Sequence, residues 1–376
     1  MKIVCDNKIP FLKGVLEPYA EVVYLPGKDT TPDDVRDADA IITRTRTACN
    51  EKLLSGSKVK VIATATIGFD HIDTAWCEAN GIEWKNAPGC NSWSVKQYIT
   101  SVLVALSKRH GFAFGDMTLG VVGVGNVGSK VADAARILGM KVLLCDPPRA
   151  RVEGDGAFVS LDEIVSRCDI ITLHVPLEKQ GGDATWHMFD EARIASLRPD
   201  QILINSSRGP VVDNAALKAA LEAHSLKAAV LDVWEGEPDL NPELVELLDI
   251  STPHIAGYSA DGKANGTTMS VRVVAEKLGL PLTEWRAEGI PAPEQALEFA
   301  LDASGKSLQE SLCEAVTYTY DVEADSRRLR SNLSLFEKLR GDYQVRREFT
   351  AYTIELTGGS PELADRLRKL GFTVNS

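Results

Sequence analysis

Short apolar runs alternate with amphipathic stretches along the first 90 residues of the chain. The runs that predict β-strands are 2–5, 21–25, 40–43, 59–64 and 82–85. Apolar positions at helical spacing recur between them, near 31–37, 51–55 and 70–80. Because strands and helices take turns along the chain, this pattern predicts a parallel sheet covered by helices.

The same alternation continues as far as residue 279. A longer periodic segment at 93–108 predicts a linker helix between two domains. Strands are predicted at 119–122, 141–145, 169–174, 201–205, 228–233 and 250–252, and helices at 129–138, 214–224 and 259–279. Ser160 and Glu163 form a capping box, which predicts a further helix start.

The pattern changes after residue 280. The stretch 281–295 contains three prolines and is typical of a connector. Beyond it, strands are predicted at 315–322 and 349–356, and helices at 334–339 and 361–369, which makes a small α/β unit of roughly 90 residues. We therefore expect an α/β protein with two Rossmann-like parallel-sheet domains and a small C-terminal α/β domain.

Composition is consistent with this architecture and excludes several classes of protein. At 376 residues the chain is long enough for two or three domains, and its 44% hydrophobic and 25% charged content is typical of a soluble protein. No apolar run approaches the roughly 20 residues that span a bilayer, and the N-terminus lacks a signal-peptide pattern. We therefore expect a cytoplasmic protein without membrane contact.

The cysteine pattern and the net charge limit which metals, disulfides and binding partners are expected. The seven cysteines are scattered, odd in number and never spaced as C-x-x-C, which argues for reduced thiols and against a zinc site or a disulfide framework. The net charge of −12 disfavours nucleic acid as a partner. An anionic substrate would need a local cluster of arginines.

The clearest motif is GVGNVG, in which Gly123, Gly125 and Gly128 follow a predicted strand and open a predicted helix. The next strand ends in Asp146, which completes the dinucleotide-binding pattern. A pyrophosphate would lie at the helix N-terminus, with Asn126 and Val127 in the same turn. Asp146 would accept hydrogen bonds from a ribose diol and repel a 2′-phosphate, so NAD is expected over NADP. The alternative is a tight turn without a ligand.

Two polar side chains stand out directly after predicted strands. Arg208 lies in NSSRGP after 201–205, and could reach a carboxylate or carbonyl oxygen or remain a solvated loop arginine. His254 lies in TPHIAGY after 250–252, an unusual place for a core histidine. A histidine can accept a hydroxyl proton near neutral pH, and a carboxylate such as Glu237 would orient its ring.

At this point the sequence resembles a known family. The stretches GVGNVG…CDPPR, HVPL, NSSRGPVVD, LDVWEGEP and TPHIAGYS, in this order, resemble the D-isomer-specific 2-hydroxyacid dehydrogenases. Within that family, TATIGFDHID, NAPGCN, TPHIAGYSADGKANGT and YQVRREF favour the members that oxidise 4-phospho-D-erythronate in the biosynthesis of pyridoxal phosphate. The broad resemblance covers about residues 1–285, and the tail motif extends it to the C-terminus.

The resemblance implies roles for individual residues. Arg208, Glu237 and His254 match the family's catalytic arginine, glutamate and histidine. The implied NAD contacts are Asp146, Ser206, Ser207, Arg208, Asp232 and Gly257, and the implied substrate contacts are Thr45, Thr66 and Tyr258. The implied domains are a flavodoxin-like substrate domain (1–92 with 258–285), an NAD-binding domain (93–257) and a C-terminal dimerisation domain (286–376), so a homodimer is expected.

Arg44 and Arg46 are candidates for binding the substrate's phosphate. They follow the predicted strand 40–43 and alternate with threonines, so an extended segment would point both arginines to one face. The alternative is that they pair with surface acids. Arg346 and Arg347 could add charge from the tail, but nothing in the sequence locates them.

The expected activity is NAD-dependent oxidation of a phosphorylated 2-hydroxy acid. One alternative is a dehydrogenase for another hydroxy acid, such as 3-phosphoglycerate or glycerate. The other is a corepressor-like protein that senses NAD without turnover, because a fold alone does not define a function.

Overall fold

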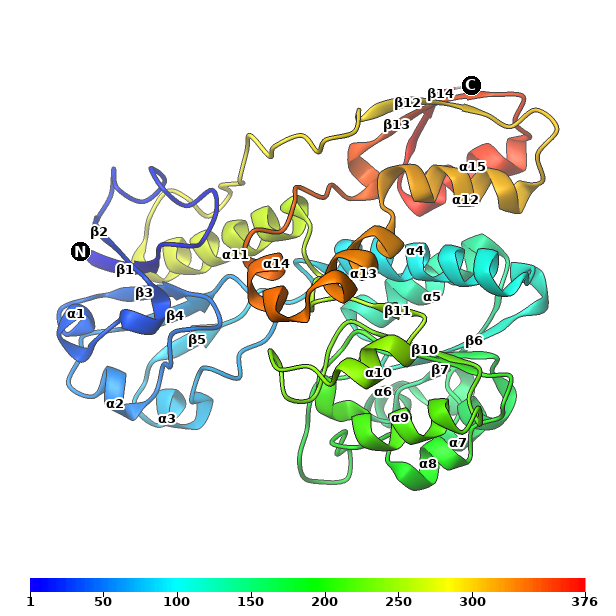
Figure 1. Cartoon of the computed structure of the whole chain (residues 1–376). Helices are drawn as coiled ribbons and strands as arrows, with labels where there is room; N and C mark the ends of the chain where they lie inside the picture. Colours follow the sequence, from blue (N-terminus) through cyan, green and yellow to red (C-terminus); the bar gives the residue numbers. More distant parts are fainter. Residues whose placement is uncertain (376) are drawn as a thin grey trace. The chain divides into compact units, whose positions relative to one another are not determined.

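The computed structural model describes residues 1–375, except for the side chain of Asp155. The chain divides into two compact units. The first comprises Met1–Asn91 and Ser259–Pro291, and the second comprises Ser92–Tyr258 and Ala292–Ser376. Figure 1 labels the helices and strands of both units.

The first unit is built on a five-stranded parallel sheet. Its strands are β1 (Lys2–Asp6), β2 (Glu21–Leu25), β3 (Ala40–Thr43), β4 (Val61–Thr64) and β5 (Glu83–Lys85), and its helices are α1 (Pro32–Val35), α2 (Glu51–Leu54), α3 (Thr74–Ala79) and α11 (Ala260–Leu278). The strand order β2-β1-β3-β4-β5 is the flavodoxin-like order. Because α11 packs on β3 and β4, the segment after Tyr258 completes this unit.

The second unit contains a six-stranded parallel sheet. Its strands are β6 (Thr118–Val122), β7 (Lys141–Cys145), β8 (Ile170–Leu173), β9 (Ile202–Asn205), β10 (Ala228–Leu231) and β11 (Ile250–Ser251), in the order β11-β10-β9-β8-β6-β7. The chain leaves β6 toward β7 on one side and returns to β8 on the other. The carboxyl end of β6 therefore lies at a topological switch point, where open α/β sheets bind their ligands.

The helices that follow the strands of this sheet are α5 (Asn126–Leu138), α6 (Pro147–Glu153), α7 (Leu161–Arg167), α8 (Glu191–Ala195), α9 (Asn214–Glu222) and α10 (Pro242–Leu247). Side chains of α5 pack in one core cluster with one set of strand residues, and those of α7 to α10 pack in a second cluster with the alternate set, so both faces of the sheet are covered. The predicted capping box is present, since Ser160 Oγ accepts from the Glu163 N–H at 3.2 Å and Glu163 Oε2 accepts from the Ser160 N–H at 3.0 Å. Helix α4 (Ser92–His110) is a core helix, because every residue from Ser94 to Ser107 is buried.

The C-terminal part of the second unit adds a three-stranded parallel sheet. The strands are β12 (Glu298–Asp302), β13 (Thr353–Thr357) and β14 (Thr373–Asn375), and the helices are α12 (Leu308–Thr319), α13 (Val322–Ser331), α14 (Phe336–Gly341) and α15 (Pro361–Leu370). Its apolar side chains share one core with those of α4 and α5. The predicted α/β fold class with parallel sheets is confirmed.

The strand predicted at 315–322 is wrong. This stretch is the second half of α12 and the start of α13 (Figure 1). Its β-branched and aromatic residues favour a strand locally, but Leu312, Ala315, Val316 and Thr319 are buried at helical spacing. The strand predicted at 349–356 is β13, preceded by a short turn of 3₁₀ helix.

No helix within residues 1–375 combines the length and the apolar character that crossing a membrane requires.

Candidate active site

The glycine-rich loop joins β6 to α5. Gly123 has φ +83°, a left-handed conformation that glycine adopts without strain, and a side chain there would meet the His174 carbonyl oxygen at 2.6 Å. A Cβ on Gly128 would lie 1.9 Å from the Gly123 carbonyl oxygen. Only glycine fits at both positions. Helix α5 then begins with no side-chain cap, so its first N–H groups are available to an anion such as a pyrophosphate.

Asp146 follows β7 and fastens this loop to the end of the strand. Its Oδ2 accepts a hydrogen bond from the Val124 N–H at 2.8 Å, and its Oδ1 accepts one from the Arg149 N–H at 3.0 Å. An ionised carboxylate has about four acceptor sites, so the same group could also accept a ribose hydroxyl.

The loop that carries Arg208 follows β9 and is organised by Asn205, which is fully buried. The Asn205 Oδ1 accepts from the Ser207 N–H at 3.0 Å and from the Ser207 hydroxyl at 2.8 Å, and its Nδ2 donates to the Arg208 carbonyl at 2.9 Å. The Ser206 hydroxyl is buried and has no hydrogen-bond partner within residues 1–375. An orphaned buried hydroxyl of this kind fits a loop that donates to a bound cofactor.

The loop that carries Arg208 lies close to the loop after β10 because residue 209 is a glycine. A Cβ at this position would lie 2.0 Å from the Trp234 carbonyl oxygen. The backbone after β9 therefore packs directly against the backbone after β10. Arg208 is half-buried, and its Nη1 donates to the Ser207 carbonyl at 2.8 Å.

His254 and Glu237 form a hydrogen-bonded pair. His254 Nδ1 lies 2.8 Å from Glu237 Oε2, and Glu237 Oε1 accepts from the Trp234 N–H at 2.9 Å. Because the ionised carboxylate can only accept, Nδ1 carries the proton and Nε2 has a free lone pair. The side chain of His254 is 33% exposed, so the ring is partly accessible from solvent.

The surroundings keep Glu237 ionised. Burial by itself raises the pKa of its carboxyl, but the hydrogen bonds from His254 and the Trp234 N–H, together with the positive charge of Arg340, bring the pKa below its ordinary value. The backbone of His254 has φ +56°, a strained conformation for a residue with a side chain. A strained backbone conformation persists only where surrounding contacts hold it, and such conformations are common at active sites.

Asp232 holds the backbone of the histidine loop, which we define as residues 253–258. The carboxylate is buried and accepts from the Ile255 N–H at 2.8 Å, the Ala256 N–H at 2.9 Å and the Thr252 hydroxyl at 2.6 Å. Tyr98 from α4 extends this network to Thr252, with the two hydroxyl oxygens 2.7 Å apart. The family resemblance implies an NAD contact for Asp232, whereas these bonds give it a positioning role as well.

Arg208, Glu237 and His254 follow β9, β10 and β11, which are neighbours in the sheet. Since the strands are parallel, their carboxyl ends lie at one edge, and all three side chains start from that edge. The carboxyl edge therefore brings together a proton acceptor, its carboxylate partner and a guanidinium. This set can bind an anionic substrate and remove a hydroxyl proton.

The remaining predicted residues lie partly in the first unit. Arg44 and Thr66 follow β3 and β4, neighbouring parallel strands, so both lie at the carboxyl edge of that sheet. Thr66 Oγ1 donates to the Gly68 carbonyl at 2.9 Å, and Arg44 Nη1 donates to the Lys8 carbonyl at 3.2 Å.

The extended segment expected at 44–47 is wrong. The chain turns at Thr45 and Arg46 directly after β3, so the two arginines do not share a face through strand alternation. Thr45 and Arg46 are exposed and Arg44 is half-buried. The turn follows from the end of sheet pairing at Thr43, the last residue with a strand neighbour.

Three residues whose positions could not be predicted from the sequence lie against the histidine loop. Arg346 Nη2 donates to the Ala256 carbonyl at 2.6 Å, and Arg340 Nη2 donates to the Tyr258 hydroxyl at 3.3 Å. The rings of Tyr343 and Tyr258 meet edge to face at 6.1 Å. Their approach is a product of long-range packing, and only the tail motif YQVRREF hinted at Tyr343 and Arg346.

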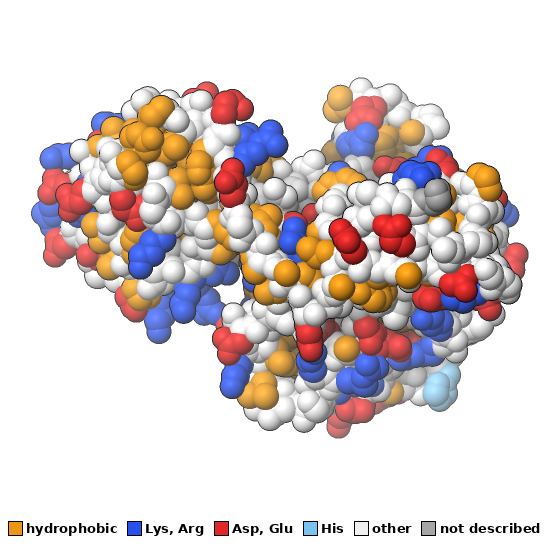
Figure 2. Space-filling view, turned by 90° about the horizontal axis from the view of Figure 1, so that it is seen from above, with side chains coloured by type: hydrophobic (Ala, Val, Ile, Leu, Met, Phe, Trp, Pro, Cys, Tyr) orange, Lys and Arg blue, Asp and Glu red, His pale blue; other side chains and the backbone are white. Residues whose placement is uncertain are grey.

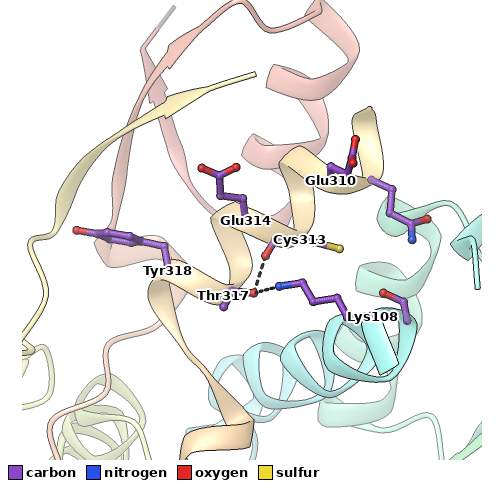
Figure 3. A pocket seen from close by; sticks show the side chains of 8 residues that line it. Lys108, Glu310, Cys313, Glu314, Thr317 and Tyr318 are labelled. Atoms are coloured by element: carbon purple, nitrogen blue, oxygen red, sulfur yellow. Dashed lines mark hydrogen bonds between the residues drawn. The ribbon is translucent and has the colours of Figure 1, made fainter. Parts of the chain in front are cut away.

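A broad depression between α4 and α12 lies apart from these residues (Figure 3). Lys108 Nζ donates to the Thr317 hydroxyl at 3.1 Å, and Glu314 pairs with Lys306 at 2.5 Å. Burial raises the pKa of the Cys313 thiol, which keeps it protonated and unreactive. Because these groups are already paired or inert, we do not place the reaction there.

Comparisons with known proteins agree with this geometry. Residues 93–256 match the family "D-isomer specific 2-hydroxyacid dehydrogenase, NAD binding domain", and residues 293–371 match "Domain of unknown function (DUF3410)". The D-lactate dehydrogenase of Aquifex aeolicus, solved with NAD and lactic acid, aligns with a TM-score of 0.63 at 28% identity. The alignment covers 78% of this chain and 100% of that chain.

Two curated relatives match along nearly the whole chain. The erythronate-4-phosphate dehydrogenase of Bacteroides fragilis is 51% identical over 358 residues, which cover 95% of this chain and 100% of the relative. The enzyme of the same name from Klebsiella pneumoniae is 44% identical over 375 residues, covering 99% and 98%. The predicted family, enzyme class and NAD cofactor are confirmed. The chain belongs to the erythronate-4-phosphate dehydrogenases, within the NAD-dependent D-isomer-specific 2-hydroxyacid dehydrogenase family.

Proposed function

We propose that this chain oxidises 4-phospho-D-erythronate at C2 to (R)-3-hydroxy-2-oxo-4-phosphonooxybutanoate, a step in the biosynthesis of pyridoxal 5′-phosphate. The observation that carries this proposal is the 2.8 Å contact between His254 Nδ1 and Glu237 Oε2 at the carboxyl edge of an NAD-binding sheet. A protein that only senses NAD has no need of a poised proton acceptor, so the corepressor-like alternative is not favoured.

The residues of the chain divide the work of the reaction. His254 Nε2 accepts the proton of the C2 hydroxyl, and Glu237 holds the ring and stabilises the charge that it acquires. Arg208 binds the substrate carboxylate and polarises the developing C2 carbonyl. When bound, NAD supplies the acceptor for the hydride that leaves C2.

The cofactor would be held by residues that fit it in the structure. Gly123 and Gly128 allow the backbone to approach a pyrophosphate, and the first N–H groups of α5 can bind it. Asp146 would accept from the adenine ribose, and the orphaned Ser206 hydroxyl would donate to the cofactor. The contacts at Ser207, Asp232 and Gly257 remain part of this proposal.

The substrate would be bound by Thr45, Thr66 and Tyr258, with Arg44 and Arg46 near its phosphate. An acidic protein needs such local positive charge, and Figure 2 shows Lys and Arg side chains interspersed with acidic ones on the face drawn. Residues 1–92 with 258–285 would act as the substrate domain, residues 93–257 as the NAD-binding domain and residues 286–376 as the dimerisation domain. We further infer a cytoplasmic homodimer that does not bind nucleic acid.

The test is turnover by the purified protein. NADH formation should be fast with 4-phospho-D-erythronate and slow with erythronate, 3-phosphoglycerate and glycerate. Faster turnover of 3-phosphoglycerate or glycerate would replace the substrate in this proposal, and no turnover of any 2-hydroxy acid would reject it.

A further inference from the structure

Residues 336–346, which we call the tail clamp, pack against the histidine loop. Arg346 is 2% exposed, and its Nη2 donates to the Ala256 carbonyl at 2.6 Å. Its guanidinium carbon lies 4.5 Å from the centroid of the Tyr320 ring. Tyr343 rests its ring on Tyr258 and donates its hydroxyl to buried Asp325 at 2.6 Å. These buried contacts give the tail clamp a defined position against this loop.

Arg340 is the member of the tail clamp that points toward the site. It lies one helical turn after Phe336, whose ring is 1% exposed and anchors α14 in the core. The guanidinium carbon is 5.6 Å from the Phe336 ring centroid, and Nη2 donates to the Tyr258 hydroxyl at 3.3 Å. The Arg340 charge also acts on Glu237, the partner of the proton acceptor.

Arg340 retains donors for a ligand. Its Nη1 donates to Glu337 at 3.4 Å and its Nη2 to Tyr258, which leaves one further N–H on each nitrogen. The side chain is 21% exposed. A guanidinium with further N–H groups can bind the oxygens of a phosphate or a carboxylate through charge-assisted hydrogen bonds.

A comparison of the relatives favours a phosphate over a carboxylate as the ligand of Arg340. D-lactate dehydrogenase, whose bound acid has a carboxylate and no phosphate, is covered completely by 78% of this chain. The relatives named for a phosphorylated acid match 95% and 99% of the chain, and residues 293–371 form a separate domain family. The tail clamp lies within this additional domain, so it can supply what a phosphorylated substrate needs.

We propose that Arg340 binds the phosphate of the substrate and thereby contributes to the choice of a phosphorylated 2-hydroxy acid. The C-terminal domain would then have a part in specificity besides any part in assembly. This inference rests on the proposed function, since it takes the same substrate at the same site.

The test compares R340Q, R340K and the wild type with 4-phospho-D-erythronate and with erythronate. Loss of a charge-assisted contact should raise the KM for the phosphorylated acid about 10- to 100-fold in R340Q, with little change for erythronate. R340K keeps the positive charge but lacks the guanidinium N–H groups. Its KM for 4-phospho-D-erythronate should lie between those of the wild type and R340Q. K338Q removes an exposed charge from the same helix and should behave as the wild type.

Inorganic phosphate provides a second measurement. It should compete with erythronate in the wild type, and the competition should weaken at least about tenfold in R340Q. If R340Q does not fold, the KM values of R340K and its competition by inorganic phosphate test the same assignment. Equal losses on both acids, a fall in kcat alone or an unchanged KM would overturn the assignment. Absence of any turnover by the wild type would instead reject the proposed function, so the two failures are distinguishable.

Discussion

His254 Nδ1 lies 2.8 Å from Glu237 Oε2, although the two residues are 17 positions apart along the chain. The contact assigns the proton of the ring to Nδ1 and directs the lone pair of Nε2 away from the carboxylate. Since β10 and β11 are adjacent, the loops that follow them supply the two halves of this pair.

Replacing His254 should remove the proton acceptor. We expect H254N to lower kcat by about 10²–10⁴ while NAD affinity changes only a few-fold, because general-base catalysis contributes this much. Asparagine is preferable to alanine, since it tolerates the φ of +56° at this position. The measurements are steady-state rates and NAD titration.

His187 offers a matched control. It also has a positive φ, +46°, and its Nε2 lies 2.7 Å from Glu235 Oε1. H187N should leave kcat near the wild-type value. Equal losses in H187N and H254N would mean that the loss in H254N reflects the fold and not catalysis.

Glu237 should make a pH-dependent contribution to stability. Its pKa is lower in the folded chain than in an unfolded one, so ionised Glu237 stabilises the fold above the unfolded pKa of about 4.3, and this contribution is lost as the pH falls through the lower folded value. We therefore expect the Tm of E237Q to lie below that of the wild type at pH 7, with the difference shrinking toward pH 3. A difference that grows at acid pH would contradict this sign.

Asp146 should determine the choice of cofactor. D146S should erode a wild-type preference for NAD over NADP, because it removes the negative charge that repels a 2′-phosphate. Serine can still cap α6, which limits the structural damage. The measurement is kcat/KM with each cofactor, and a wild type that uses both equally would refute the role.

Arg44 and Arg46 should act on the phosphorylated substrate alone. Hydrogen bonds to charged groups contribute roughly 1.5–3 kcal/mol each, so R44Q or R46Q should raise the KM for 4-phospho-D-erythronate by about one to two decades. Activity on erythronate should barely change. Equal losses on both acids would assign these arginines to the fold or to the carboxylate.

The full-length chain should sediment as a dimer at micromolar concentration. Truncation near residue 286 is a poor test, because Leu312, Val316 and Tyr352 share a core with Val102 and Leu103 of α4. Sedimentation equilibrium of the intact protein avoids this problem. A monomer across the accessible concentration range would contradict the prediction.

The sequence by itself determined the features that depend on neighbours in the chain. The periodicity of apolar side chains predicts the alternation of strands and helices. Local sequence signals predict the Ser160 capping box and the helix end at Gly279. Gly123 was identifiable because its left-handed turn conformation favours glycine, and Gly128 because the motif brings it against the Gly123 carbonyl oxygen, where a Cβ does not fit. Arg208, Glu237 and His254 were identifiable because each follows a strand and matches a family motif.

Only the tertiary structure decided which of these groups meet. Strand order made β9, β10 and β11 neighbours, and burial turned 315–322 into helix against its local preference for strand. Arg340 and Arg346 reach the histidine loop from more than 80 positions away, according to bonds that span 82 and 90 residues. No local signal encodes such contacts, because their free energy comes from surfaces that become adjacent only when the whole unit packs.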